Sequence, residues 1–292
     1  MKKASEDKRR SVSVSGVLKH LCVSKNGYYA WIKRSPSKRE LRKFDLQKKI
    51  LKIYEESRQI YGAPKITREL RKNGDKVAER TVTRYMHDMG IHAWYRRPYT
   101  VTTVSKDFSN QLKNIIKRDF CPDKPDCVWC TDITYIHTER GFLYLSCIMD
   151  LYSRKIVAWN LGRTLETNHV IKAVNEAIAR TGKKPLIIHT DRGIQYTSRE
   201  YSDCTEGIQK SYSDKGSPWD NACIESFHSL LKREWLWRFK IRDYNHAYSL
   251  IFEYINTFYN TMRIHSHCGY LSPQAYERQY YSKMKSAEKD AA

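Results

Sequence analysis

No stretch of the sequence approaches the ~18 uninterrupted apolar residues that a membrane-spanning helix needs, and charged residues make up 29% of the chain. The basic residues 1–10 lead into no apolar segment, so they do not resemble a secretory signal. The chain also lacks a Walker phosphate loop, a dinucleotide-binding glycine pattern, a hydrolase nucleophile elbow and a sustained heptad repeat. We therefore expect a cytoplasmic protein in which the eight cysteines are mainly free thiols.

Positive charge is unevenly distributed along the 292 residues. Lys and Arg number 53 against 32 acidic residues, which gives a net charge of +21. Residues 1–120 hold 30 of the basic residues and only 12 of the acidic ones. Because Lys and Arg release condensed counterions when they bind phosphates, this excess predicts a polyanionic partner, most simply nucleic acid.

The sequence pattern predicts that the N-terminal part of the chain is mainly helical. We predict a basic tail and a helix-turn-helix-like segment over residues 1–40, a helical DNA-binding region over 41–92 and a basic connector over 93–120. Helices over about 64–73 and 77–89, separated by an Asn-Gly turn, resemble a helix-turn-helix DNA reader. A helical bundle with an ordinary solvated basic face is the alternative. The side chains expected to contact DNA in these regions are Arg80, Thr83, Arg84, Arg96 and Arg97.

After residue 120 the pattern changes to strands. We predict three antiparallel strands, then a helix over 168–180 and a short, fully buried strand over 186–189. This order indicates an α/β domain over residues 121–240, followed by a helical C-terminal segment over 241–292. The three predicted antiparallel strands cover residues 128–136, 142–150 and 154–161.

Three acidic residues stand out by their context. Asp132 lies inside the first predicted strand, where an unpaired buried acid would cost several kcal/mol. Asp191 follows the buried strand, and the carboxyl ends of strands are where α/β folds place their sites. Glu225 lies near the start of a predicted helix. Any one of them alone is more simply read as a solvated or ion-paired acid.

Several ordered segments of the chain match one known family pattern. They are residues 61–66, 129–135, 149–154, 189–198 and 216–227, with further matches at Tyr259, Asn260, Arg263, His265, Ser272 and Pro273. With these segments the chain resembles the OrfB part of the bacterial insertion-sequence transposases encoded as an OrfA/OrfB pair, and more distantly the retroviral integrases. The resemblance covers nearly the whole chain, from about residue 12 to 280.

The resemblance implies an RNase H-like catalytic domain with a mixed sheet, in which Asp132, Asp191 and Glu225 bind two Mg²⁺ or Mn²⁺ ions. It implies metal-dependent DNA strand cleavage and strand transfer, with Lys232 contacting DNA near the active site. The implied partners are the double-stranded element ends and target, further copies of the chain, and an upstream OrfA segment. A non-catalytic DNA-binding regulator and a metal-dependent nuclease without joining activity remain alternatives.

The interval between the second and third acidic residues departs from the family pattern. It contains 33 residues, 192–224, which is two fewer than usual. The shortened part, 201–208, is polar, and we expect no apolar stripe there to pack on the sheet. We assign the third ligand to Glu225, with Asp220 as a helix cap and Glu234 on the opposite helix face. The other acids weighed for this role are Glu206 and Asp214.

Two further features near these segments have simple explanations. Cys127 and Cys130 have a metal-like spacing but lack a second pair, so we do not predict a zinc site. Most aromatic residues belong in the core, although Trp219 and Trp235 flank the Glu225 helix and are candidates to stack on a splayed base.

Overall fold

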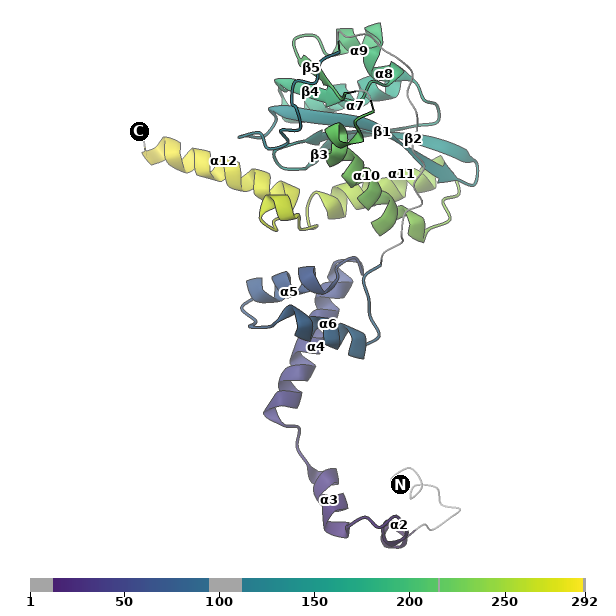
Figure 1. The fold of residues 1–292 in the computed structure, drawn as a ribbon, viewed down its shortest axis with the longest axis vertical. Coiled ribbons are helices and arrows are strands. Elements are labelled where there is room, and N and C mark those ends of the chain that lie inside the picture. The colour runs from purple at the N-terminus through teal and green to yellow at the C-terminus, as the bar shows by residue number, and fades with distance from the viewer. Residues whose placement is uncertain (1–12, 95–111, 215, 291–292) are drawn as a thin grey trace. The chain divides into compact units, whose positions relative to one another are not determined.

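The structure is a computed structural model that describes residues 13–94, 112–214 and 216–290 (Figure 1). It contains two compact units, residues 1–52 and 53–292, which are considered separately below. The predicted DNA contacts Arg96 and Arg97 lie outside the described residues. No helix in the described part of the chain is both long enough and apolar enough to cross a membrane.

Serine side chains begin the helices of the first unit. The Oγ atoms of Ser13 and Ser24 accept hydrogen bonds from backbone amides three residues later, which satisfies donors that a helix start leaves unpaired. Ser37 and Glu40 form a reciprocal capping box. Leu18 is fully buried, whereas Leu21, three residues later, is 55% exposed. The helices are α2 (Val14–His20), α3 (Lys25–Lys33) and α4 (Lys38–Glu56), of which α4 continues into the second unit.

The predicted pair of helices before the connector is present as α5 (Ala63–Lys72) and α6 (Glu79–Asp88). Gly74 lies in the turn between them with a φ of 90°, a conformation that glycine adopts without strain. The apolar face of α6 is buried as expected, whereas Arg80, Thr83 and Arg84 are exposed. The face that carries these three predicted DNA contacts is therefore exposed, as both the helix-turn-helix prediction and its alternative require.

A five-stranded mixed sheet forms the centre of the second unit, with strand order β3-β2-β1-β4-β5 (Figure 1). β1 pairs antiparallel with β2 and parallel with β4, and β4 pairs parallel with β5. The four predicted strands are present, but the short polar strand β5 was missed. The strands are β1 (Val128–Thr138), β2 (Gly141–Asp150), β3 (Ile156–Gly162), β4 (Ile187–Thr190) and β5 (Gln209–Tyr212).

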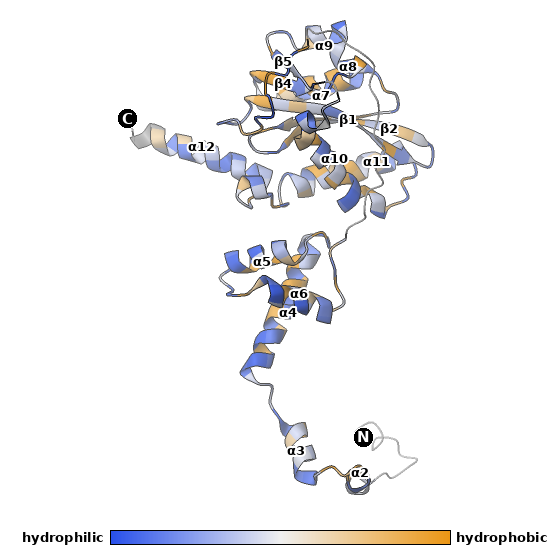
Figure 2. Ribbon diagram, in the orientation of Figure 1, coloured by the Kyte–Doolittle hydropathy of each residue, from blue (hydrophilic) through white to orange (hydrophobic). Residues whose placement is uncertain are grey.

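Helices α7 (Thr167–Thr181), α8 (Ile194–Thr197) and α9 (Arg199–Cys204) pack on one face of this sheet. Trp129, Ile188 and Tyr201 belong to their shared core, and each is fully buried. The expectation that the shortened segment cannot pack is therefore wrong, because Tyr201 of α9 supplies a large buried ring. Figure 2 shows the hydrophobic residues concentrated in the strands.

The opposite face receives α10 (Ala222–Glu234), which contacts β1. Near the end of α10, Glu234 accepts two hydrogen bonds from Arg263 and one from the Tyr254 hydroxyl. The C-terminal segment is helical, as predicted. It contains α11 (Tyr244–Phe252), the π-helix η3 (Glu253–Tyr259), the 3-10 turn η4 (Ser266–Cys268) and α12 (Pro273–Asp290). Two 3-10 turns flank α10: η1 (Pro218–Asn221) precedes it and η2 (Leu236–Arg238) follows it.

Candidate active site

Strand pairing brings the first two acidic residues together. β1 and β4 run parallel, and their register aligns Cys130 with His189. Asp132 lies two residues after Cys130, and Asp191 lies two residues after His189. The register therefore brings both acids to the same edge of the sheet. Asp132 projects from the face opposite the Trp129 core, because side chains alternate along a strand.

Helix α10 supplies the third acid and a histidine that contacts the first. Glu225 lies in the first turn of α10 and is exposed. One turn later, His228 is buried, and its Nδ1 atom lies 3.2 Å from Oδ2 of Asp132. Residues three apart share a helix face, so this contact directs the Glu225 face of α10 toward Asp132.

The three carboxylates influence one another electrostatically. Desolvation and the charges of Asp132 and Asp191 raise the pKa of Glu225 to about 7. Desolvation and the charge of Asp132 also raise the pKa of Asp191 to about 6, although the Gly193 amide lowers it. Like charges held close together disfavour ionisation. The acids therefore form one site in which a positive partner would relieve mutual repulsion.

The loop after β4 fixes the carboxylate of Asp191. Its Oδ1 accepts a 2.9 Å hydrogen bond from the backbone amide of Gly193. A Cβ on residue 193 would lie 3.0 Å from that oxygen and 3.3 Å from Oε1 of Gln195. Glycine thus permits the close approach of backbone to carboxylate, a requirement that the sequence analysis did not identify.

Two other acids weighed as third ligand have complete structural roles. Asp220 accepts hydrogen bonds from Arg118 (2.6 Å), Asn114 (2.9 Å) and the backbone amide of Asp214 (2.8 Å). It therefore holds the loop before α10. The prediction that Asp220 caps this helix is wrong, because Arg118, Asn114 and the Asp214 amide occupy its carboxylate. Glu234 is buried against Arg263, on the far side of α10 as predicted.

The remaining two acids are exposed. Glu206 lies beyond the end of α9, and Asp214 is 3.7 Å from Nη2 of Arg192. Among the described residues, no group of three or more His, Cys, Asp or Glu side chains is already arranged to hold a metal ion. The oxygen donors of Asp132, Asp191 and Glu225 nevertheless suit Mg²⁺, which prefers hard oxygen ligands and retains several waters.

Lys232 lies two turns beyond Glu225 on α10. Desolvation lowers its pKa, whereas the negative charge of Asp132 raises it. Desolvation outweighs the charge, so the pKa is lowered, and the ammonium group lies within the electrostatic field of Asp132. Of the two tryptophans considered for base stacking, Trp219 is 70% exposed, but Trp235 is buried and unavailable.

The sequence matches family patterns over both units. Residues 122–218 and 206–273 match patterns described as "Integrase core domain", and residues 40–99 match one described as "HTH-like domain". The transposase for insertion sequence element IS904 of Lactococcus lactis is 38% identical over 84% of this chain and 98% of its own length. The chain belongs to the family of bacterial insertion-sequence transposases.

Other members of the transposase family include the transposase InsF of IS3A from Escherichia coli, which is 33% identical over 93% of this chain and 96% of its own length. The integrase core match and the sheet order confirm the predicted RNase H-like fold. The catalytic core domain of HTLV-2 integrase is 17% identical, with a TM-score of 0.43, over 53% of this chain and 98% of that one.

Proposed function

We propose that this transposase cleaves and joins DNA strands at insertion-sequence ends, using Asp132, Asp191 and Glu225 as the ligands of two divalent cations. The observation that carries the proposal is the β1–β4 register together with the contact of His228 on α10 with Asp132, which supports a common site for the three carboxylates. Two Mg²⁺ or Mn²⁺ ions would activate the attacking oxygen and stabilise the leaving oxygen of an in-line displacement.

The side chains of this site have separate roles in the proposal. Asp132 on β1 and Asp191 directly after β4 would hold the ions, and Glu225 would complete the ligand set from α10. Lys232 neutralises a DNA phosphate beside them. Water first attacks the phosphodiester at the element end and releases a 3′ hydroxyl. That hydroxyl then attacks a target phosphodiester, so one bond forms as another breaks and no covalent protein intermediate is needed.

The exposed basic face of α6 supports binding of duplex DNA in the same reaction. Arg80, Thr83 and Arg84 are exposed on a second helix that follows a short turn, which is the arrangement by which helix-turn-helix proteins present a recognition helix. Further copies of the chain and an upstream OrfA segment are the proposed partners in assembly on DNA.

Strand cleavage and transfer with labelled element ends test the proposal. Full-length protein with Mg²⁺ or Mn²⁺ should perform both steps. Asp132→Asn, Asp191→Asn and Glu225→Gln should each abolish both steps while leaving DNA affinity nearly unchanged. Asp220→Asn is the matched control, since it also removes one carboxylate charge but outside the proposed ligand set; it should lower stability and retain activity.

Four results would contradict the assignment. Full activity in EDTA would exclude a metal-dependent reaction. Cleavage without joining would favour a nuclease, and metal-independent DNA binding with neither step would favour a regulator of transposition. Wild-type rates from Glu225→Gln, with loss from Glu206→Gln or Asp214→Asn, would show that another acid is the third ligand.

A further inference from the structure

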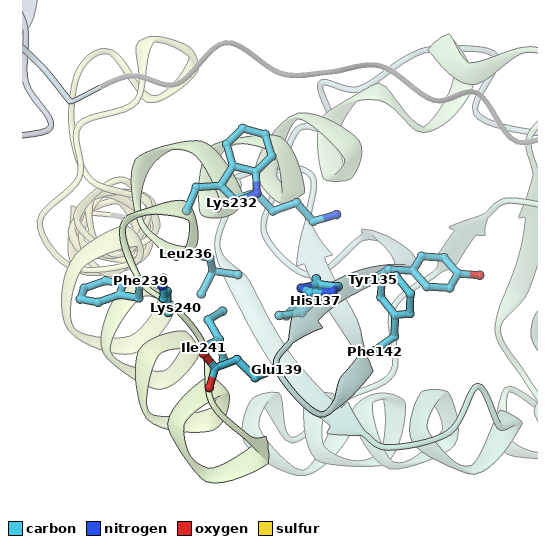
Figure 3. A pocket seen from close by; sticks show the side chains of 11 residues that line it. Tyr135, His137, Glu139, Phe142, Lys232, Leu236, Phe239, Lys240 and Ile241 are labelled. Atoms are coloured by element: carbon cyan, nitrogen blue, oxygen red, sulfur yellow. The ribbon is translucent and has the colours of Figure 1, made fainter.

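Two cavities are lined by different faces of helix α10. The first, shown in Figure 3, is lined by Lys232, which lies seven residues after Glu225 and therefore shares its helix face. The second has a volume of about 360 Å³, within the roughly 300–1,000 Å³ typical of small-molecule sites. Its lining from α10 is Cys223, Ser226 and Leu230, which lie roughly 100–160° around the helix from Glu225. The second cavity therefore lies away from the face that carries the proposed metal ligand.

The other walls of this second cavity, which we call the Arg154 cavity, include Arg154 and His265. Arg154 lies in the turn between β2 and β3 and is only 7% exposed. Its Nη2 atom donates a 3.0 Å hydrogen bond to the carbonyl oxygen of Phe120 and lies 3.4 Å from Nδ1 of His267. Its Nη1 atom is buried and has no hydrogen-bond partner among the described residues. Because a buried donor on a charged group is costly without an acceptor, Arg154 has unused capacity to bind one.

The backbone of Arg154 is held in an unfavourable conformation. Its φ of 62° lies in the left-handed region, which residues with a β-carbon rarely adopt. Two backbone hydrogen bonds of 2.9 Å, from Arg154 to Asp150 and from Asp150 to Lys155, maintain this turn. Such conformations cluster at functional sites, where the surrounding structure holds a group in place. Here the group is a guanidinium that lines a cavity.

The charge of Arg154 is open to an anion. No carboxylate lines the Arg154 cavity in the part of the chain that the structure describes. The carboxylate of Asp150, in the same turn, is already occupied. It accepts hydrogen bonds of 2.6–3.0 Å from the amide of Asp126 and from the amide and hydroxyl of Ser153. An anion in the cavity would therefore meet a positive charge without a competing acid in the lining.

His265 also lines the cavity and supplies a second donor. Desolvation and the charges of Arg263 and Arg154 lower its pKa to about 4, so the ring is neutral near pH 7. Its Nδ1 atom accepts a 3.2 Å hydrogen bond from the backbone amide of His267, so its Nε2 atom carries the proton and can donate. The hydroxyl of Ser226, an exposed residue, is a third donor. Because Ser226 lies near the start of α10, the positive end of the helix dipole adds to the attraction for an anion.

We propose that the Arg154 cavity binds a phosphate group, whose oxygens accept from Nη1 of Arg154, Nε2 of His265 and Oγ of Ser226. A phosphate offers several acceptor oxygens and the negative charge that makes hydrogen bonds to a guanidinium strong. The backbone of a bound DNA strand and a free phosphate compound present this same chemistry. The site lies on another face of α10 from Glu225, so it goes beyond the proposed function and does not depend on it.

Protection of Cys223 from alkylation reports on occupancy, because this half-buried thiol lines the cavity. Full-length protein without divalent cation is treated with iodoacetamide in inorganic phosphate, in duplex DNA, or in chloride at the same ionic strength. Peptide mass spectrometry then gives the alkylation rate of each cysteine. Phosphate, DNA or both should slow the reaction of Cys223 relative to chloride. Cys204 on α9, also half-buried, should react at the same rate under all three conditions.

Two variants assign the protection to the proposed donors. Arg154→Lys keeps the positive charge but removes the guanidinium fork. It should raise the ligand concentration for half-maximal protection by about 10- to 150-fold, which corresponds to the roughly 1.5–3 kcal/mol of a hydrogen bond to a charged group. Ser226→Ala changes an exposed residue and should raise that concentration by about 2- to 12-fold. Arg180→Lys on α7 and Ser249→Ala on α11 are the matched controls and should leave protection of Cys223 unchanged.

The three conditions also distinguish the source of the phosphate. Protection by DNA alone would identify a backbone phosphodiester, protection by inorganic phosphate alone a free phosphate compound, and protection by both a site that accepts either. Equal alkylation of Cys223 in all three conditions, or protection that neither variant weakens, would overturn the proposal. If Arg154→Lys lowers the melting temperature, Ser226→Ala decides by itself. Loss of strand cleavage in Glu225→Gln, by contrast, bears only on the proposed reaction.

Discussion

The Nδ1 atom of His228 lies 3.2 Å from Oδ2 of Asp132 and joins helix α10 to strand β1. His228 is only 4% exposed, and its Nε2 atom has no hydrogen-bond partner among the described residues. The histidine therefore has a single polar contact there, with one of the proposed metal ligands. Groups that hydrogen-bond to a metal ligand orient it, and losing one commonly costs 10–100-fold in metal affinity or activity.

We expect His228 to act as a positioning residue for Asp132. In His228→Asn the side-chain amide nitrogen takes nearly the place of Nδ1, so most activity should remain. In His228→Gln the amide reaches the place of Nε2, and both this variant and His228→Ala should lose about 10–100-fold in Mn²⁺ affinity. Mn²⁺ binding followed by electron paramagnetic resonance, together with DNA affinity, separates this effect from unfolding. Equal Mn²⁺ affinity in the Asn, Gln and Ala variants would refute the role.

Gly193→Ala should impair catalysis without weakening DNA binding. The new methyl group would lie 3.0 Å from Oδ1 of Asp191, so the carboxylate or the loop must move. Because a displacement of about 1 Å can cost 10²-fold in rate, we expect a loss of at least about tenfold in single-turnover cleavage. Gly16→Ala is the matched control, since its nearest contact would be an ordinary 3.8 Å. Unchanged cleavage by Gly193→Ala would show that the loop accommodates a side chain.

The buried pair of Glu234 and Arg263 predicts a dependence of stability on pH. Burial alone would raise the pKa of Glu234, but the hydrogen bonds and charge of Arg263 outweigh it, and the pKa is lowered. This contribution is therefore fully present above the ordinary glutamate pKa near 4.5 and is lost as the pH falls through the lower folded value. Arg263 stays protonated throughout, so the acid titrates alone.

Urea unfolding of Glu234→Gln measures that contribution. Breaking one partner of a buried ion pair costs about 3–5 kcal/mol, and we expect a loss in this range at pH 7. The difference from wild type should shrink as the pH is lowered below about 4.5, because the wild-type carboxyl then also becomes neutral. A difference that is the same at pH 7 and in acid would show that packing, and not the charge of Glu234, supplies the stability.

Candidate site residues could be identified from the sequence where the chemistry of a side chain conflicted with the hydrophobic pattern around it. Asp132 was identifiable because an acid stood inside an apolar strand, and Asp191 because it followed a buried one. His228 was missed, although its spacing of three from Glu225 on a predicted helix was a usable signal. Strand β5 was missed because its four residues are mostly polar, and its pairing with β4 depends on contacts that a local pattern does not contain.

Other errors arose from tertiary packing that overrides local preference. A short acid before a helix is statistically a cap, but Asp220 instead accepts from Arg118 and Asn114, which lie about a hundred residues earlier. Trp235 was placed correctly next to the active-site helix, yet the segment after α10 turns its ring inward. At the end of the β1–β2 hairpin, Tyr135 pairs with Tyr144 and His137 with Phe142, so the grouping of these rings depended on the register of the two strands.

The exposed face of α6 should control affinity for duplex DNA independently of catalysis. Arg80→Ala and Arg84→Ala each remove one cation from this face, so each should reduce the slope of log affinity against log salt by about 0.9 if the lost contact is to a duplex phosphate. Lys172→Ala is the matched control, since it removes an exposed cation from α7, outside the proposed DNA face. Fluorescence anisotropy at several salt concentrations, using full-length protein and no divalent cation, gives both affinity and slope.

Slopes identical to wild type in both arginine variants would show that another surface, and not α6, contacts the phosphates. A loss confined to one DNA sequence, with the slope unchanged, would instead indicate contact with a base edge, because phosphate contacts are independent of sequence.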